Sequence, residues 1–236
     1  MPAIIFLRIC AMPAIIFLSL CAIKAFIFPA SVSYRMSLSV NECIYYSHNS
    51  EGVDMNKTEQ LLTQEEIRRI LDLPDAGTCA GRRDRALLSL LCDAGLKTQE
   101  LLDLRLENLD LQISCVLLPG QKSGEKVRMV PFGERTRSAL VDYLYDIRGR
   151  AEGPLTRVFT GMNNGVLSRQ AVWKLVRKYG KAAGVGEGLS PENLRASFAV
   201  GLLLKGAEPA SVSRMLGIGT AAVKKYVLLA KKAKNP

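Results

Sequence analysis

Helix start and stop signals follow one another through the last three-quarters of the chain, and they constrain its fold more than any other feature. Thr63 and Glu66 form a T-x-x-E capping box, and Pro74 ends the short helix that follows. Gly95 closes the next helix, and Thr98 is expected to cap a third. The predicted helices after the first span residues 82–92, 98–104, 134–147, 168–183, 190–205 and 209–216, with a last one capped by Thr220 and followed by a basic tail at 230–236.

Only two segments are rich in strand-forming residues. They span residues 113–118 and 126–132, and the turn-forming sequence PGQKSGE joins them. This arrangement predicts a β-hairpin between helices. The expected fold class is therefore mainly α with one small antiparallel β-sheet, an α+β domain.

Residues 1–54 differ from the rest and contain the near-repeat MPAIIFLRICA-MPAIIFLSLCA. An apolar stretch between Arg8 and Lys24 is compatible with a signal peptide or a short membrane segment, although about fifteen residues is short against the roughly 20 needed to span a bilayer. Alternatively, translation begins at Met55 and the preceding segment is not made. We therefore divide the chain into a tail, 1–54, and a main domain, 55–236.

The net charge, the cysteine spacing and the single histidine limit which kinds of function the main domain can have. The formal net charge of +10 arises entirely after Asp54 and suggests a polyanionic partner, with nucleic acid ahead of an anionic membrane. The six cysteines form no C-x-x-C pair, which favours a cytoplasmic protein with reduced thiols. Because His48 is the only histidine, histidine-based zinc sites and Ser-His or Cys-His catalysis are not expected in the main domain, and we predict no metal and no cofactor.

Four sequence boxes occur in a fixed order along the main domain. They read DAGLKTQELLDLRLENLDL at 93–111, GQKSGEKVRMVPF at 120–132, LSPENLRASFAVGLL at 189–203, and MLGIGTAAVKKYVLLA at 215–230. Taken together, over roughly residues 62–230, these boxes resemble the catalytic domain of the tyrosine recombinase, or phage integrase, family. The resemblance implies a recombinase fold that cleaves and rejoins DNA through a 3′-phosphotyrosyl intermediate, in integration or inversion of a mobile element.

The resemblance also implies roles for particular residues. Tyr226 matches the nucleophile, Arg195 the second catalytic arginine, and Lys122 the hairpin lysine, with Lys126 as a second choice for that lysine. Lys97 stands where the family has its first catalytic arginine, and Glu192 where it has a histidine. Lysine keeps the positive charge of arginine but not its bidentate fork, so we expect weakened catalysis.

Two further features bear on activity. Ile218 replaces a histidine before the tyrosine and cannot donate a hydrogen bond. Each candidate also has an ordinary interpretation, since Tyr226 could be a packed aromatic, Arg195 could pair with Glu192, and the lysines could be solvated. Trp173 is interpreted as a core or half-buried packing residue with no chemistry.

Two basic clusters are predicted to contact DNA phosphates. Their members are Arg169, Lys174, Arg177, Lys178 and Lys181 on one helix, and Lys224 and Lys225 beside the tyrosine with Lys231, Lys232 and Lys234 after it. The expected partner is double-stranded DNA, with no small-molecule substrate. A homo- or hetero-oligomer on DNA is expected, which could include a full-length recombinase, because the tail does not resemble the DNA-clamping domain that precedes the catalytic domain in the family.

Two functions compete with an active recombinase. One is a catalytically impaired DNA-binding accessory of a recombination system, which would never form a covalent DNA adduct. The other is a membrane-tethered protein that uses residues 1–34, in place of the expected cytoplasmic, nucleoid-associated location. Membrane fractionation that depends on the tail would distinguish the second.

Overall fold

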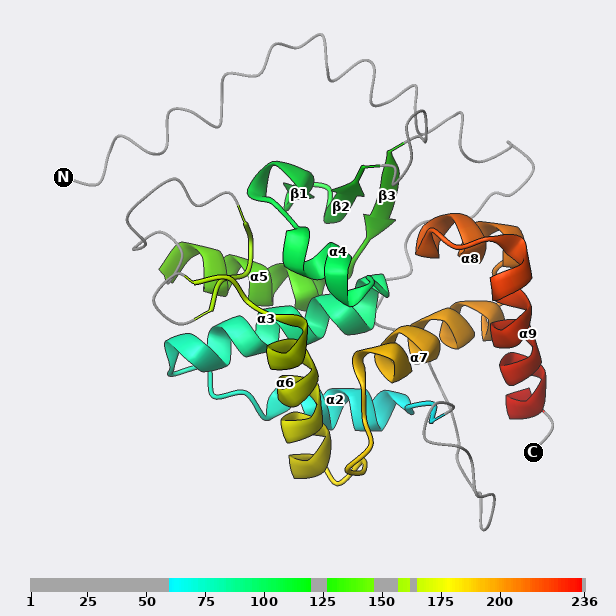
Figure 1. Ribbon diagram of the computed structural model, residues 1–236, viewed down its shortest axis with the longest axis horizontal. Helices are drawn as coiled ribbons and strands as arrows, with labels where there is room; N and C mark the ends of the chain where they lie inside the picture. The colour runs from blue at the N-terminus through cyan, green and yellow to red at the C-terminus, as the bar shows by residue number, and fades with distance from the viewer. Residues whose placement is uncertain (1–59, 120–126, 147–156, 162–164, 235–236) are drawn as a thin grey trace, which may run out of the picture. The chain divides into compact units, whose positions relative to one another are not determined.

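The computed structural model describes residues 60–119, 127–146, 157–161 and 165–234. The predicted division at residues 54 and 55, the tail and the hairpin turn with Lys122 and Lys126 lie outside these residues. Helices dominate the described part (Figure 1). They are α2 (Gln64–Asp72), α3 (Cys79–Ala94), α4 (Thr98–Asp103), the 3-10 turn η2 (Leu106–Asn108), α5 (Glu134–Asp146), α6 (Arg169–Ala182), α7 (Pro191–Leu204), α8 (Pro209–Leu216) and α9 (Thr220–Lys234).

Local sequence signals set most helix ends. Thr63 caps α2 through the expected capping box with Glu66, and Ser190 caps α7 with proline at its first position. Gly95 and Gly217 end α3 and α8 with backbones in the left-handed region, at φ 55° and 61°. These predictions are confirmed.

Three local predictions are wrong. Thr98 is the first residue of α4 rather than its cap, because the Glu100 side chain accepts a hydrogen bond from the Lys97 backbone N–H at 2.9 Å and so makes Lys97 the N-cap. Thr220 is likewise inside α9, whose first turn bonds back to the Gly219 carbonyl. The predicted basic tail is helical as far as Lys234, and Leu229 and Ala230 pack in the core.

The sheet is a three-stranded antiparallel meander of β1 (Leu109–Asp110), β2 (Cys115–Leu118) and β3 (Arg128–Pro131). β2 pairs with β3 so that Val116 lies opposite Val130, which confirms the predicted hairpin. β3 runs beside both α3 and α8. A mainly helical fold with a small antiparallel sheet is thus confirmed, and β3 brings the hairpin next to the C-terminal helices.

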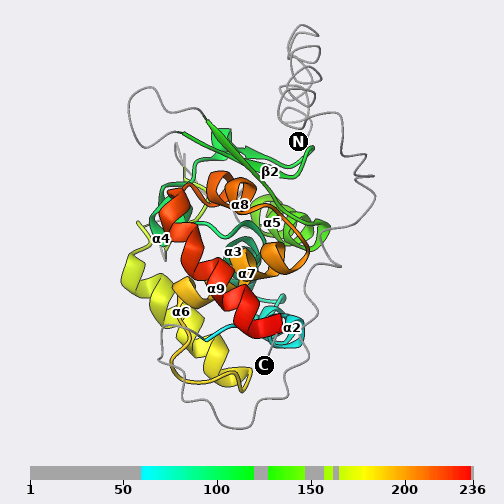
Figure 2. The ribbon, with the colours of Figure 1, turned by 90° about the vertical axis from the view of Figure 1, so that its right-hand side faces the viewer.

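Two apolar clusters make up the core. The larger one surrounds α3, which packs against α2, α5 and α7, and includes the fully buried Leu87, Leu90 and Tyr143. The second cluster lies among α7, α8 and α9, which appear together at one side of Figure 1, and α9 crosses in front of α7 in Figure 2. Leu216 and Tyr226 belong to this second cluster. Burial of these apolar faces orients α9 against α7.

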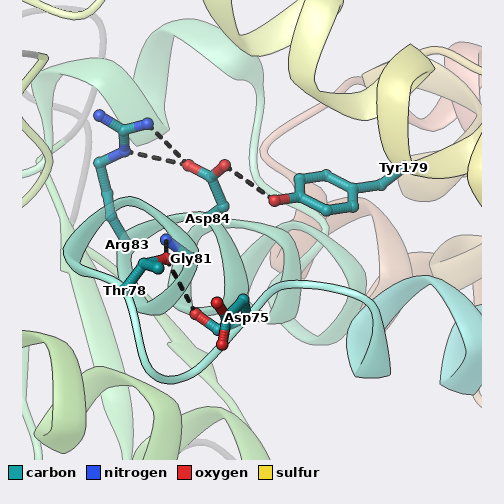
Figure 3. Close-up of polar contacts among 6 residues, drawn as sticks. All are labelled: Asp75, Thr78, Gly81, Arg83, Asp84 and Tyr179. Carbon is teal, nitrogen blue, oxygen red and sulfur yellow. Dashed lines mark hydrogen bonds and ion pairs between the residues drawn. The ribbon is translucent and has the colours of Figure 1, made fainter.

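A polar joint links α3 to α6 (Figure 3). The Tyr179 hydroxyl donates to the buried Asp84 carboxylate at 3.0 Å, and Arg83 pairs with the other oxygen of Asp84 at 2.8 Å. Burial, reinforced by the negative charge of Asp84, raises the pKa of Tyr179 to about 12, so the phenol remains a donor at neutral pH. A pocket of about 330 Å³ opens beside this joint. Both oxygens of the buried Asp84 carboxylate already have partners, Tyr179 and Arg83. We therefore assign these contacts a structural role.

The helices of the described residues include none with both the length and the apolar character needed to cross a membrane.

Candidate active site

Arg195 is the centre of the candidate site. It lies on α7, is only 8% exposed, and donates from its guanidinium to two backbone carbonyls, Gly95 and Leu216, the latter at 2.7 Å. Gly95 is the residue that follows the last turn of α3, and Leu216 is the last residue of α8. The carbonyls at the C-terminal end of a helix have no hydrogen-bond partner within the helix, so both are available to Arg195. One side chain therefore joins three helices, and its planar fork is fixed in orientation.

Gly95 makes this arrangement sterically possible. A Cβ at this position would lie 2.3 Å from the Phe198 ring on α7, and the backbone φ of 55° also disfavours other residues. Glycine therefore lets the carbonyl end of α3 approach α7 closely enough to accept from Arg195.

Tyr226 lies next to Arg195. It projects from α9, is 7% exposed, and packs with Phe198 and Leu216 in the second apolar cluster. The Lys225 ammonium sits 5.0 Å from the centroid of its ring. The structure thus brings together two of the sequence-predicted site residues, the tyrosine and the second arginine, from helices that the chain folds against each other.

A second charged group adjoins this pair. Glu100 on α4 is 10% exposed at its side chain, and its carboxylate pairs with the Arg128 guanidinium at 2.8 Å and the Lys97 ammonium at 3.8 Å. Arg128 reaches this position from β3. Lys97 is therefore at the site, held next to a carboxylate and a second guanidinium that the sequence analysis did not single out.

The electrostatic effects on Arg195 indicate which groups face it. Burial lowers the pKa of the Arg195 guanidinium, while Glu100 and then the Tyr226 hydroxyl raise it, and the positive charge of Arg128 lowers it. Arg195, Arg128, Glu100 and Tyr226 therefore form one interacting group. Arginine stays charged throughout the physiological range, so this group presents a fixed positive charge.

Two predicted positions behave differently. Glu192 is exposed on the first turn of α7 and forms no hydrogen bond or ion pair with the other residues that the structure describes, so neither the proposed pairing with Arg195 nor one with Lys97 occurs there. Ile218 packs against the second apolar cluster, and its carbonyl accepts from Ser213 at 2.6 Å. Lys122 lies outside the described residues.

The predicted DNA-contacting residues of α6 lie on an exposed helix. Arg169 donates to Gln99 at 2.8 Å, and Arg177 donates to the Glu187 carbonyl at 2.8 Å while stacking 4.5 Å from the centroid of the Trp173 ring. Trp173 is 43% exposed, so it is not a core residue. The remaining predicted contacts, Lys174, Lys178, Lys181, Lys224 and Lys225, are all exposed, and Lys181 pairs with Glu187.

Arg128 and Glu100 were missed for identifiable reasons. Strand alternation places Arg128 on the same face as the buried Val130, so an arginine on the inner face of a strand was a usable signal. Glu100 lies three residues after Lys97, the spacing of a helical ion pair. Each signal is weak alone, because a four-residue strand and a six-residue helix provide little periodicity.

The sequence of this chain is similar to those of known recombinases. Over 163 residues it is 37% identical to tyrosine recombinase XerD of Staphylococcus aureus (strain Mu50), and this match covers 68% of this chain and 55% of that protein. It is 34% identical to tyrosine recombinase XerD of Staphylococcus epidermidis (strain RP62A) with the same coverage. The chain thus spans about half the length of the curated relatives it matches.

Solved structures share the fold. The chain superposes on XerA recombinase with a TM-score of 0.65 and 24% identity, over 80% of this chain and 64% of that one. It superposes on XerH site-specific recombinase bound to difH substrate in a pre-cleavage complex with a TM-score of 0.62 and 22% identity, over 74% and 52% of the two chains. The profile of the Phage integrase family matches residues 60–231, close to the limits that the four boxes predicted. This chain therefore belongs to the phage integrase family, the family of the tyrosine recombinases.

Proposed function

We propose that this chain cleaves and rejoins DNA in site-specific recombination, with Tyr226 as nucleophile. The observation that carries the proposal is the buried Arg195 guanidinium, fixed by two backbone carbonyls and facing the Tyr226 hydroxyl. An arginine held in this way is set up to bind a phosphodiester beside a potential nucleophile. The XerD relatives, whose names identify them as tyrosine recombinases, support the same activity for this chain.

The proposed chemistry requires no metal or other cofactor. The Tyr226 hydroxyl gives up its proton to solvent as its oxygen attacks phosphorus, the bond to the 5′-oxygen breaks, and the product is a 3′-phosphotyrosyl link with a free 5′-hydroxyl. Arg195 stabilises the negative charge that grows on the non-bridging oxygens. We propose that Lys122 delivers the proton that the leaving 5′-oxygen needs. Attack by a 5′-hydroxyl on the phosphotyrosine reverses these steps and seals the strand.

A second candidate function is that of an impaired accessory that occupies recombination sites without cutting. Two observations favour it. Ile218 offers only an apolar side chain, and Glu192 adds negative charge at the start of α7. As an accessory, the protein would use the buried Arg195 to stabilise its fold and to bind DNA, and a separate, active recombinase would cleave the DNA.

Trapping of the covalent intermediate distinguishes the two functions. The full chain is incubated with nicked duplexes made from the DNA that flanks its own gene, so that cleavage releases a short fragment and prevents resealing. Denaturing electrophoresis then resolves protein-linked DNA. A covalent band supports the recombinase, whereas retarded DNA on a native gel without a covalent band at any flank supports the accessory.

Restoring arginine at position 97 should increase activity. Lys97 offers an ammonium where a guanidinium could bind two oxygens, and it shares Glu100 with Arg128. We expect Lys97→Arg to accelerate formation of the covalent complex by about 10-fold in single-turnover assays. Lys97→Gln serves as the opposite control and should slow it. An unchanged or lower rate in Lys97→Arg would show that the lysine is adapted to this site.

The proposed DNA surface includes α6, which lies on the outside of the helical domain in both views (Figures 1 and 2). The stacked Arg177 and the Gln99-bonded Arg169 are held in position before DNA binds, which lowers the entropy cost of a contact. The Lys181–Glu187 pair is exposed, and exposed pairs contribute about 1 kcal/mol or less, so Lys181 can exchange its partner for a phosphate. We further propose that the protein works as an oligomer on duplex DNA.

Removing charge from α6 should weaken DNA binding in a salt-dependent way. We expect the double variant Lys174→Gln/Lys178→Gln to lower affinity by roughly 10-fold at moderate salt and to reduce the slope of log K against log salt by about 2. Fluorescence anisotropy across a salt series measures both. Arg68→Gln/Arg69→Gln, which removes equal charge from exposed positions on α2, should leave the slope unchanged. Equal effects of both variants would indicate a general charge effect without a DNA face on α6.

A further inference from the structure

Arg128 has a geometry that its ion pair with Glu100 does not explain. One terminal nitrogen, Nη2, meets the Glu100 carboxylate at 2.8 Å. The Nε atom is buried and has no hydrogen-bond partner among the residues that the structure describes. Burying an N–H donor without an acceptor costs about 1–3 kcal/mol, so this arginine retains donor capacity inside the site.

The Arg128 guanidinium lies unusually close to the backbone at the end of α8. Nη1 lies against the Cα of Gly217, where a Cβ would be only 1.5 Å from it. Gly217 is also in the left-handed region at φ 61°, which favours glycine. Arg195 bonds to the carbonyl of the preceding residue, Leu216, at 2.7 Å. Two guanidiniums therefore meet the same two-residue segment at the end of α8.

The charges of this group are unbalanced. Arg128 and Arg195 face each other closely enough for each positive charge to oppose the other, and Glu100 is the carboxylate that acts on both. One carboxylate against two guanidiniums and the Lys97 ammonium leaves a net positive charge in a partly desolvated place. An anion bound between them would relieve the repulsion.

We propose that Arg128 is a second guanidinium for the scissile phosphate, supplying the guanidinium charge that Lys97 lacks. This inference rests on the proposed function and deepens it, since the anion is the phosphodiester that Tyr226 attacks. Glu100 holds Arg128 through Nη2, and the rest of the guanidinium carries its positive charge next to Arg195, where the phosphate would bind. The hairpin strand β3 thereby contributes a phosphate ligand by itself, independently of Lys122.

Arg128→Lys tests the proposal because it keeps the positive charge and removes the planar guanidinium. The full chain and the variant are compared on nicked duplexes with either a normal phosphate or a neutral methylphosphonate at the scissile position. We expect the variant to lose on the order of 10- to 100-fold in covalent-complex formation on phosphate, but less than about 3-fold on methylphosphonate, where the negative oxygen is missing. Equal losses on the two substrates would overturn the proposal in favour of a purely structural arginine.

A second measurement separates this proposal from the proposed function. Inorganic phosphate that binds the folded site should raise Tm of the full chain, and we expect that rise to disappear in both Arg128→Lys and Arg128→Gln. Arg135→Lys, on α5 and paired with Asp72, is the matched control and should retain it. One outcome is that the parent protein forms no covalent complex, while its phosphate-dependent rise in Tm is lost in the Arg128 variants. That outcome would contradict the proposed DNA cleavage and support the phosphate site. If the response is equal in all variants, the assignment of Arg128 fails.

Discussion

Tyr226→Phe should abolish the covalent protein–DNA complex while leaving the fold and DNA binding intact. Phenylalanine keeps the aromatic ring in the apolar cluster that also contains Phe198 and Leu216, keeps the face over which the Lys225 ammonium lies, and removes only the hydroxyl. With no oxygen at this position, the phosphodiester has no nucleophile, so we expect loss of product by at least three orders of magnitude, to the detection limit. Denaturing electrophoresis of nicked DNA measures the covalent product.

Two controls define the result. The free energy of unfolding should change by less than about 1 kcal/mol, because one partly satisfied hydroxyl is lost, and affinity for duplex DNA should remain within about 2-fold. Tyr179→Phe is the matched substitution at a tyrosine that hydrogen bonds to Asp84 and lies away from Arg195, and it should retain the covalent band. A covalent complex that persists in Tyr226→Phe would identify another nucleophile and refute the assignment.

Arg195→Lys should reduce both rate and stability. Lysine has three N–H donors on a single nitrogen, which cannot span the Gly95 and Leu216 carbonyls and also present a bidentate face to a phosphate, whereas the guanidinium spreads five N–H donors over three nitrogens. We expect covalent-complex formation to fall by about 10²- to 10³-fold, and the free energy of unfolding to fall by about 1–3 kcal/mol because at least one buried carbonyl loses its donor. Single-turnover cleavage and urea denaturation measure the two effects.

Arg214→Lys is the matched control, because Arg214 is exposed on α8 and its guanidinium contacts only the nearby Ser211 hydroxyl, at 3.1 Å, among the described residues. It should change neither rate nor stability appreciably. A rate loss in Arg195→Lys without a stability loss would show that the carbonyl contacts do not support the fold. The reverse result would remove Arg195 from the chemistry and favour the accessory function.

The sequence predicted those parts of the fold that depend on short local signals. Capping by Thr63 and Ser190, and helix termination at Gly95 and Gly217, each need only a few neighbouring residues. The cap of α4 was misassigned because Glu100 reaches back to the Lys97 N–H, and threonine at position 98 looked like the stronger candidate. Residues 230–236 are predicted as a basic tail because lysines dominate them, although α9 continues to Lys234 and Ala230 belongs to the apolar cluster.

The site was predictable only where the boxes of the family preserve residue identity. Arg195 and Tyr226 fall in such boxes, and the fold places them together. Arg128 could not be assigned in this way, because its role depends on contacts between β3 and the end of α8, which are far apart in sequence. Its partner Glu100 is 28 residues away. Local patterns carry no information about such a pairing.

The double attachment of Arg195 affects how related sequences should be interpreted. Because its guanidinium links the ends of α3 and α8 to α7, selection for a folded protein alone is enough to retain it. A descendant that has stopped cutting DNA would therefore lose residues such as Lys97 well before it loses this arginine. Surveys that sort active enzymes from relics should give weight to the nucleophile and the surface-accessible cations, and treat the buried arginine as a marker of an intact domain.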